Sequence, residues 1–388
     1  MRVAVIGCGF HGRGIAYELA TADGVSSLIV IDRERERAER CAAKARAEAA
    51  ILDIHDSPAL DRALQGCALI VNAVGPYHYL DNALAIVEAA LRARAHYADM
   101  ADDHDVAEAL FLDPVWDQRA KAAGIGVLTG CGIAPGLTGV LAKLGASRLD
   151  RPERVATRFS WNYSIDYPAA LHHFLRINSG AAPQFIGGEF VRPGAFAGPE
   201  TVRFLDPVGE RTVVYTGIND PVSINRSIPG LVEVTAKGAF HQKEANDFVQ
   251  SMVRWGWTNY APVEGLPRTP FEMLMAYLRS PEGRKRFDIP PEPIPMAARV
   301  SISGLRGGKT ATLHFEAQDF SRRASTTTTA KAALALAKGA LEFTGVRAPE
   351  GALDPLPYLR DLLAGPDIKI FEWEAGGTPR PLAFLDCK

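Results

Sequence analysis

The chain has 388 residues, of which 47% are hydrophobic and 23% are charged, and its formal net charge is -2. This length exceeds what one hydrophobic core usually organises, so we expect two domains with an ordinary solvated surface. The near-neutral charge leaves no basic excess to neutralise a phosphate backbone. Composition therefore argues against a nucleic-acid partner and favours a small-molecule ligand.

The cysteines are scattered, odd in number and free of CxxC spacing: Cys8, Cys41, Cys67, Cys131 and Cys387. This pattern predicts neither a disulfide framework nor a thiolate metal site, and it suits a reducing cytoplasm. The apolar run at the start ends at Gly7, unlike the longer run of a signal peptide. No stretch of the sequence is long enough to span a bilayer, so we expect no membrane partner.

The first part of the sequence alternates short β-branched runs with helical patterns, as βαβ units do. Strands are predicted at residues 2–6, 27–31, 50–54, 68–73, 95–99 and 125–129. Among the helices predicted between them are residues 12–20, 58–65 with Ser57 as N-cap, and 82–94. Right-handed crossovers would wind these units into a parallel sheet, which predicts a Rossmann domain over residues 1–141.

From about residue 142 aromatic and polar residues alternate in short pieces, which predicts a half-exposed antiparallel sheet. The pieces lie at residues 154–163, 200–215 and 231–236, followed by a proline-rich linker at 288–296 and a strand pair at 298–303 and 309–318. Helices at 330–343 and 356–364 and a strand at 368–371 return to an α/β texture. We therefore expect an α/β fold, a Rossmann dinucleotide-binding domain completed by the C-terminal segment 326–388, with an α+β domain inserted at 142–325.

A GxGxxG motif, Gly7-Cys8-Gly9-Phe10-His11-Gly12, follows the first predicted strand and opens the first predicted helix. Gly7 permits the tight turn, Gly9 lets the backbone approach a pyrophosphate, and Gly12 allows close packing of helix on strand. The helix N-terminus supplies N–H groups and positive potential for the diphosphate, and Phe10 and His11 precede it within the motif as further cofactor-binding candidates. In this context the motif predicts a dinucleotide site.

Asp32 ends the second predicted strand at the position where an acidic residue binds the adenosine ribose and repels a 2′-phosphate. This favours NAD(H) as cofactor. Arg33 and Arg35 leave NADP(H) open, because a guanidinium could pair with a 2′-phosphate or stack on adenine, and both could equally be solvated at a helix start.

Two further strand ends should contact the cofactor, since ligands bind beyond the carboxyl ends of parallel strands. Asp53 ends the third strand, where its side chain could reach the adenine edge. The fourth strand ends in NAVGPY, which should pass the nicotinamide ribose with Asn72, Ala73, Gly75 and Pro76. Any strand exit can carry such a Gly-Pro pair, so this turn could also be ordinary.

With these residues in view, the chain resembles the saccharopine dehydrogenase-like family, in which lysine 6-dehydrogenase is the nearest type. The resemblance covers most of the length and rests on VIGCGFHGRGIA (5–16), NAVGPY (72–77), HYADM (96–100), GCGIAPGLTGVLA (130–142) and GVRAPEGALD (345–354). It implies an inserted domain that binds substrate and builds homodimers. It also implies NAD(P)-dependent chemistry on the C–N bond of an amino acid or amine, such as oxidative deamination of lysine or reductive amination in reverse.

The resemblance also implies catalytic residues, because oxidation of an amine needs a group that accepts its proton. Asp99 in HYADM matches an acidic position after the family's fifth strand and could take the proton, or it could cap the next turn. His241 falls where relatives carry a Gly-His after a basic strand, but Phe240 replaces the glycine here. A structural histidine is the competing interpretation of His241.

Substrate-binding residues follow from the same resemblance. Arg226 lies in the region of a substrate-domain turn and could hold a carboxylate with two hydrogen bonds, or it could be a surface arginine. Tyr77 and His78 follow NAVG and could wall the nicotinamide pocket, or they could be packing residues.

No catalytic metal is predicted, because the sequence has no HExxH or cysteine cluster and adjacent histidines such as His172 and His173 do not share one helix face. Two alternatives to a dehydrogenase stay open. One is a transferase resembling homospermidine synthase, which passes an aminoalkyl group between amines while its NAD stays bound. The other is a non-catalytic protein that senses NAD(H).

Overall fold

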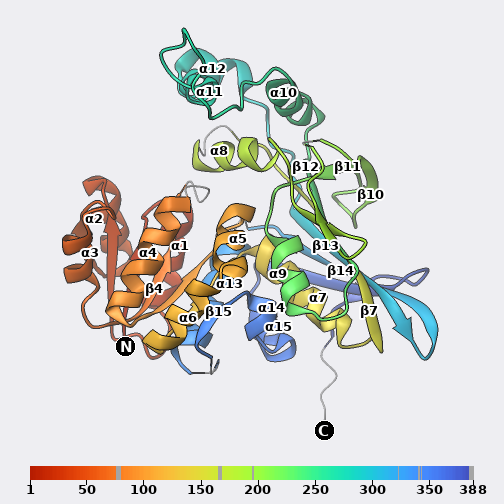
Figure 1. The fold of residues 1–388 in the computed structure, drawn as a ribbon, viewed down its shortest axis with the longest axis horizontal. Helices are drawn as coiled ribbons and strands as arrows, with labels where there is room; N and C mark the ends of the chain where they lie inside the picture. Colours follow the sequence, from red (N-terminus) through yellow and green to blue (C-terminus); the bar gives the residue numbers. More distant parts are fainter. Residues whose placement is uncertain are drawn as a thin grey trace.

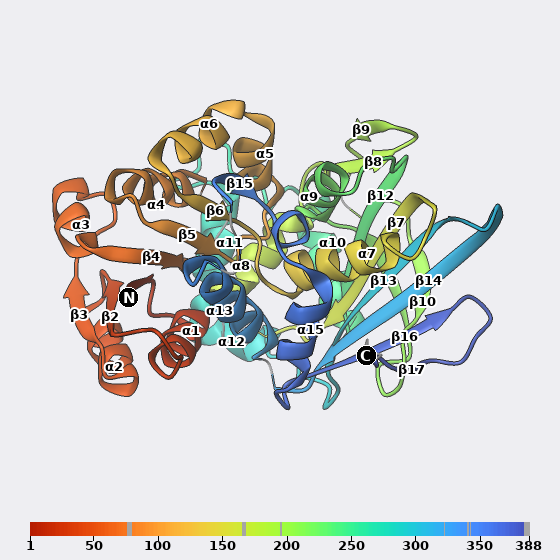
Figure 2. The same cartoon turned by 90° about the horizontal axis from the view of Figure 1, so that it is seen from below.

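The computed structural model describes residues 1–75, 80–164, 168–194, 196–321, 323–339, 341 and 343–383. Within these residues the chain builds a seven-stranded parallel sheet and a ten-stranded mixed sheet. The two sheets lie at opposite ends of the molecule, and helices α13 (Ala324–Ala337) and α15 (Pro355–Leu363) lie between them (Figure 2). The expected architecture of a Rossmann domain with a second sheet domain is confirmed.

The parallel sheet has the strand order β15-β6-β5-β4-β1-β2-β3. Its strands are β1 (Arg2–Ile6), β2 (Ser27–Asp32), β3 (Glu48–Ile51), β4 (Cys67–Asn72), β5 (His96–Asp99), β6 (Gly126–Leu128) and β15 (Gly345–Arg347). The six strands expected in the first part of the chain all occur. The third begins earlier than predicted, because the left-handed Arg46 (φ 54°) ends the preceding helix and the strand starts two residues later.

Alternation along β1 explains why this sheet is covered on both faces. Val3 and Val5 belong to a core shared with α1 and the second domain, whereas Ala4 and Ile6 belong to a core packed by α3 and α4. The covering helices are α1 (Phe10–Ala20), α2 (Arg35–Ala45), α3 (Ser57–Leu64), α4 (Leu80–Ala93), α5 (His104–Leu112) and α6 (Pro114–Ala123). The predicted N-cap of α3 was wrong by one residue, since Asp56 accepts the Ala59 N–H.

The mixed sheet has the order β10-β11-β12-β7-β13-β14-β16-β17, with β8 on β12 and β9 on β8. Its strands are β7 (Arg151–Trp161), β8 (Gln184–Ile186), β9 (Glu189–Val191), β10 (Glu200–Arg203), β11 (Glu210–Tyr215), β12 (Glu233–Phe240), β13 (Met296–Arg306), β14 (Lys309–Asp319), β16 (Ile368–Glu374) and β17 (Arg380–Pro381). The predicted antiparallel, half-exposed sheet needs correction at its centre. There β12 pairs with β7 in parallel and is buried over nearly its whole length.

The remaining helices flank this sheet: α7 (Thr138–Ala146), α8 (Pro168–Ile177), α9 (Asp220–Ser227), α10 (Lys243–Arg254), α11 (Pro270–Arg279), α12 (Pro281–Phe287) and α14 (Pro349–Ala352). Helices α10, α11 and α12 form an excursion beyond α8, away from the parallel sheet (Figure 1). No helix in the described part of the chain is long and apolar enough to cross a membrane.

The C-terminal segment, expected to return to the Rossmann domain, divides between the two sheets. Helix α13 packs on α1, β4 and β5, and β15 extends the parallel sheet beside β6. Strands β16 and β17 instead extend the mixed sheet beside β14. The chain thus leaves the Rossmann domain, returns to it and leaves it again.

A pair of buried carboxyl groups marks the junction of α14 with α7 and α9. Glu350 is 1% exposed, and a Cβ on Gly139 would lie 2.3 Å from its Oε2 atom, so the glycine makes room for the carboxyl group. Asp220 is also buried and accepts a hydrogen bond from Thr138 Oγ1 at 3.0 Å. Burial raises the pKa of Glu350 to about 7 and that of Asp220 to about 6.

Replacing Glu350 by glutamine should flatten the pH dependence of stability. The pKa of Glu350 rises from 4.5 to about 7 on folding, so the folded state keeps a proton that the unfolded chain releases above pH 4.5. The free energy of unfolding should therefore fall as pH rises from about 5 to 7, by on the order of 3 kcal/mol. Urea unfolding at intervals across this range measures the slope.

Glu350→Gln should lose the part of the slope that Glu350 carries and keep the part that Asp220 carries below about pH 6, and Glu264→Gln, at an exposed position, should keep the whole slope. An equal slope in wild type and Glu350→Gln would show that the buried carboxyl does not carry the proton.

Candidate active site

A cavity of about 960 Å³ lies where the carboxyl ends of β1, β2 and β4 face the second domain. The Rossmann side contributes the glycine turn, Asp32 at the end of β2, and Ala73 directly after β4. It also contributes Asp53, which lies two residues beyond the end of β3 at Ile51 and does not end the strand as predicted. The opposite side contributes aromatic residues of β7 and α8 and two cationic side chains, His173 and Arg279. This one cavity is therefore lined by residues that could bind a dinucleotide and by residues that could bind a substrate.

The glycine turn has the geometry that a diphosphate requires. Gly7 has φ 96°, and a Cβ there would lie 2.5 Å from the Ala73 carbonyl oxygen. A Cβ on Gly12 would lie 1.7 Å from the Gly7 carbonyl oxygen, whereas one on Gly9 would meet no atom within 4 Å. Helix α1 begins here with no side-chain cap from the described residues and no acidic residue in its first turn. Its N–H groups and an open approach at Gly9 fit a bound diphosphate.

Asp32 lies at the adenosine end of this turn. Its Oδ2 atom accepts the Cys8 N–H at 2.7 Å and its Oδ1 atom accepts the Glu34 N–H at 2.9 Å, so the carboxylate is fixed in the cavity wall. Arg33 lines the same end with a side chain that is 75% exposed. Arg35 does not line the cavity, because it pairs with Glu39 one turn along α2.

Most of the other predicted cofactor residues line the cavity. Phe10, Ala73 and Gly75 do so, as does Asp53, whose Oδ1 accepts the His55 N–H at 2.9 Å. His11 lines it too, and burial lowers its pKa to about 4. Pro76, Tyr77 and His78 lie outside the described residues.

Asn72 lies beneath the cavity wall. Its amide nitrogen donates to the Tyr97 hydroxyl at 3.0 Å and its Oδ1 accepts the Val74 N–H at 2.9 Å. Asn72 therefore stabilises the turn after β4 through its hydrogen bonds. Its position gives no support for the predicted direct contact with a cofactor.

Asp99, the first predicted catalytic residue, is placed for a structural role. It is fully buried and does not line the cavity. Its carboxylate accepts hydrogen bonds from the Tyr97 hydroxyl, the Thr129 hydroxyl and the backbone N–H groups of Ala101 and Gly130, at 2.8 to 3.1 Å. Asp99 thus joins β5 to the turn after β6. Its position gives no support for proton transfer to a substrate.

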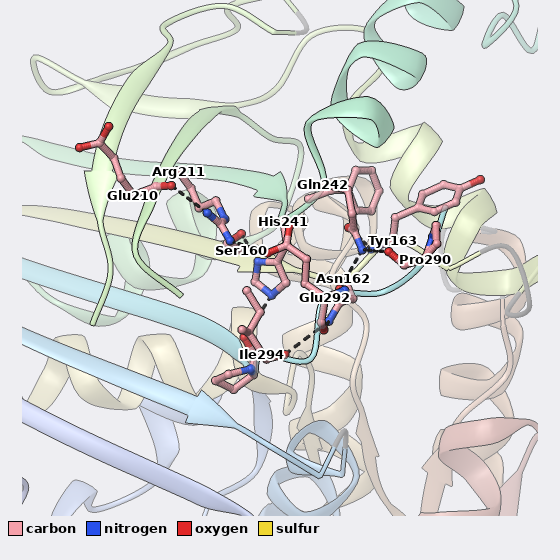
Figure 3. Close-up of polar contacts among 12 residues, drawn as sticks. Ser160, Asn162, Tyr163, Glu210, Arg211, His241, Gln242, Pro290, Glu292 and Ile294 are labelled. Atoms are coloured by element: carbon pink, nitrogen blue, oxygen red, sulfur yellow. Dashed lines mark hydrogen bonds and ion pairs between the residues drawn. The ribbon is translucent and has the colours of Figure 1, made fainter. Parts of the chain in front are cut away.

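His241, the second predicted catalytic residue, is not among the residues that line the cavity. Figure 3 shows it between Ser160 and the segment that carries Glu292 and Ile294. Its Nδ1 accepts from the Ser160 hydroxyl at 2.7 Å and its Nε2 donates to the Pro295 carbonyl at 3.1 Å. Burial and then the charge of Arg211 lower its pKa to about 4, so the ring is neutral. His241 therefore fastens the proline-rich linker to β7.

Arg226, the predicted carboxylate ligand, is likewise occupied elsewhere. Its Nη1 donates to the Phe111 carbonyl at 2.8 Å, which joins α9 to α5 outside the cavity. Phe240, the departure from the family pattern, is buried at the end of β12 and packs against Trp161 at 5.4 Å between ring centroids. Phe240 does not line the cavity itself but packs against Trp161, which does.

The residues that the sequence did not reveal are His173 and Asp102, which meet in the cavity wall. His173 Nε2 lies 2.8 Å from Asp102 Oδ2, and its Nδ1 lies 3.5 Å from Asp103 Oδ2. Burial opposes protonation, but the two carboxylates outweigh it and raise the pKa of His173 to about 10. The pair Asp102-Asp103 beside HYADM was the available signal, yet nothing local shows that α8 brings a histidine to it.

One ligand atom from each of Asp102, Asp103 and His173 lies within 4.8 Å of the others, a spacing that could hold a metal ion. A protonated imidazole between two carboxylates satisfies the same charges without an ion. The sequence-based expectation of no catalytic metal stays a prediction.

An apolar wall faces the glycine turn from the second domain. Trp161 of β7 stacks on Phe159 at 4.8 Å and lies 4.8 Å from Phe174 of α8, measured between ring centroids. All three rings line the cavity beside His173. Such a wall removes water from the place where a nicotinamide and a substrate carbon would meet.

Comparisons with known proteins identify relatives of the first domain and of the whole fold. Residues 3–128 match the family model described as the saccharopine dehydrogenase NADP binding domain. Carboxyaminopropylagmatine dehydrogenase of Synechocystis sp. is 28% identical over 147 residues, which are 36% of this chain and 36% of that protein. The match thus spans about a third of that relative's length.

Solved structures with the same fold extend over nearly the whole chain. Apo saccharopine dehydrogenase (L-Glu forming) from Saccharomyces cerevisiae has a TM-score of 0.69 at 16% identity and covers 96% of this chain and 99% of its own. Homospermidine synthase from Legionella pneumophila in complex with NAD has a TM-score of 0.60 at 11% identity, covering 94% and 89%. The resemblance to the saccharopine dehydrogenase-like family is confirmed over residues 3–128, which match the NADP binding domain of that family, and the solved structures show the same fold over nearly the whole chain.

Proposed function

We propose that this protein is a nicotinamide-dependent oxidoreductase that acts on the C–N bond of an amino acid or amine, with His173 as its proton carrier. The observation that carries the proposal is that His173 and Asp102 form an ion pair that lines the same cavity as the glycine turn. The dehydrogenases among its relatives support the reaction class. The donor group and the substrate are part of the proposal.

The cofactor that we propose is NAD(H). When bound, it supplies hydride exchange with the carbon that carries the nitrogen. Gly7, Gly9 and the first turn of α1 would hold its diphosphate, and Asp32 would accept hydrogen bonds from its adenosine ribose. Asp53 and Gly75 line the ends of the same groove.

His173 gives the site a proton to donate at neutral pH. Reduction of a C=N bond adds a hydride at carbon and a proton at nitrogen, and an imidazolium in the cavity wall can supply that proton. Oxidation of an amine needs the reverse transfer, which only neutral His173 can accept. Because the pKa of His173 lies near 10, His173 is protonated near neutral pH and favours reductive amination there. In alkaline solution it becomes neutral and favours oxidation of the amine.

The purified protein should convert an amine when it is given NAD and a panel of lysine, ornithine, saccharopine and polyamines, or NADH with the matching carbonyl compounds and amines. Absorbance of the reduced cofactor reports turnover. Product formation without net change in NADH would indicate aminoalkyl transfer instead, and NADH binding without turnover of any substrate would indicate a sensing protein.

Removing the charge of Asp32 should change cofactor preference. Asp32→Asn keeps an oxygen for the Cys8 N–H but loses the carboxylate that would bind the ribose and repel a 2′-phosphate. We expect NADH binding to weaken roughly tenfold, as for loss of a charge-assisted hydrogen bond, and NADPH binding to tighten. Calorimetric titration of both cofactors measures this, with the exposed Asp23→Asn as control. Tighter binding of NADPH than NADH by the wild type would refute the choice of NAD(H).

Replacing His173 by glutamine should lower kcat by roughly 10²- to 10⁴-fold, the usual contribution of a general acid or base. Wild-type amine oxidation should accelerate as pH rises towards 10, because the neutral form of His173 grows with pH. His173→Gln should keep only the ionisation of the substrate amine in its pH profile. Initial rates from pH 7 to 11 test this.

His241→Gln is the matched control, because His241 lies outside the cavity lining. It should lower stability while leaving the shape of the pH profile unchanged. Equal kinetic losses in the two variants would remove His173 from the proposed role.

A further inference from the structure

The charges of the substrate side of the cavity are almost all satisfied within the protein. His173 pairs with Asp102. Asn162 donates to the Glu292 and Ile294 carbonyls and accepts from Gln242 and from the Glu292 N–H (Figure 3). Around these groups the wall is aromatic and aliphatic. A charged group that lacks a protein partner here would therefore mark where a substrate charge binds.

Arg279, the last residue of α11, is such a group. It lines the cavity, and no described carboxylate lies within ion-pair distance of its guanidinium. Other arginines of the second domain differ, since Arg176 pairs with Asp103 and Asp105, and Arg211 pairs with Glu292. Arg279 is solvent-exposed where it lines the cavity, and its guanidinium offers paired N–H donors in the geometry that a carboxylate accepts.

Aromatic packing fixes Arg279 relative to the proton carrier. Phe271 of the same helix packs edge-on against His172, the neighbour of His173, at 4.3 Å between ring centroids. Tyr260 stacks on Phe271, also at 4.3 Å. These contacts hold α11 against α8. The charge of Arg279 reaches α8 as well, because burial and then Arg279 lower the pKa of His172 to about 3.

We propose that Arg279 binds the carboxylate of the substrate, so that the enzyme selects carboxylated amines, such as amino acids, over plain diamines and polyamines. The proposal rests on the proposed function and adds a substrate class and a specificity residue to it. The helical excursion is then part of the active site, because it carries the residue that holds one end of the substrate while His173 serves the nitrogen at the other.

The test compares carboxylated amines with their decarboxylated counterparts: L-lysine and L-ornithine against cadaverine and putrescine, with saccharopine as a further carboxylated probe. The full-length wild type should prefer the carboxylated member of each pair. Arg279→Gln should lower kcat/KM for it by roughly 10- to 100-fold, mainly through KM, the expected effect of losing a charge-assisted pair. Its kcat/KM for the diamines should not fall and should rise if anything, because they have no carboxylate to lose a partner and their second ammonium group is no longer repelled by the guanidinium.

Arg279→Lys should restore part of the loss, and Arg268→Gln, at an exposed position before α11, should have no effect. Calorimetric titration of the same probes into the NADH-loaded protein gives a readout that does not need turnover. Equal use of diamines and amino acids by the wild type, equal losses on both by Arg279→Gln, or no binding of any carboxylated probe would overturn the proposal. Absence of turnover with intact, Arg279-dependent binding would instead count only against the proposed reaction.

Discussion

The contact between the glycine turn and helix α1 is the constraint on which the rest of the site depends. With a Cβ on Gly12 only 1.7 Å from the Gly7 carbonyl oxygen, the helix can start this close to the sheet only because no side chain is present. The same turn is tied to its neighbours, since the Gly7 N–H donates to Ile31 and the Ala73 N–H donates to Ile6. The helix N-terminus, the carboxylate of Asp32 and the β4 end therefore face one crevice.

The other half of the site depends on contacts between residues far apart in sequence. His173 of α8 owes its charge to Asp102 and Asp103, which follow β5 in the first domain. The charge of His173, the proton carrier that we propose, therefore depends on contact between the two domains. Helix α13 packs closely on α1 in the first domain, since a Cβ on Gly14 would lie 2.7 Å from Thr326 Cγ2.

Local patterns predicted the strands of the Rossmann domain, the glycine turn and the cavity positions of Asp32 and Asp53, because each depends on residues close in sequence. Asp99 and His241, which motif position predicted as catalytic, do not line the cavity. Asp99 does end a strand, but its side chain points into the turn that it braces, and sequence does not show which way a side chain faces. His173 and Arg279 reach the cavity from other elements, through tertiary packing that no local pattern encodes.

The parallel pairing of β7 and β12 at the centre of the mixed sheet was not predicted, for a similar reason. Alternation of polar and apolar residues reports which faces of a strand are covered, but β12 is covered on both and pairs with β7 across a long connection through α8 and α9. The pairing is decided by topology rather than by local sequence.

The division of the C-terminal segment between the two sheets determines the order in which the two sheets can be completed during synthesis. The first domain acquires its edge strand β15 only after the ribosome has made the intervening sheet, and that sheet in turn acquires β16 and β17 later still. Neither domain can be released as a finished unit before the other has begun to form. Nascent chains of this protein are therefore expected to expose unpaired strand edges for longer than chains whose domains follow one another in sequence.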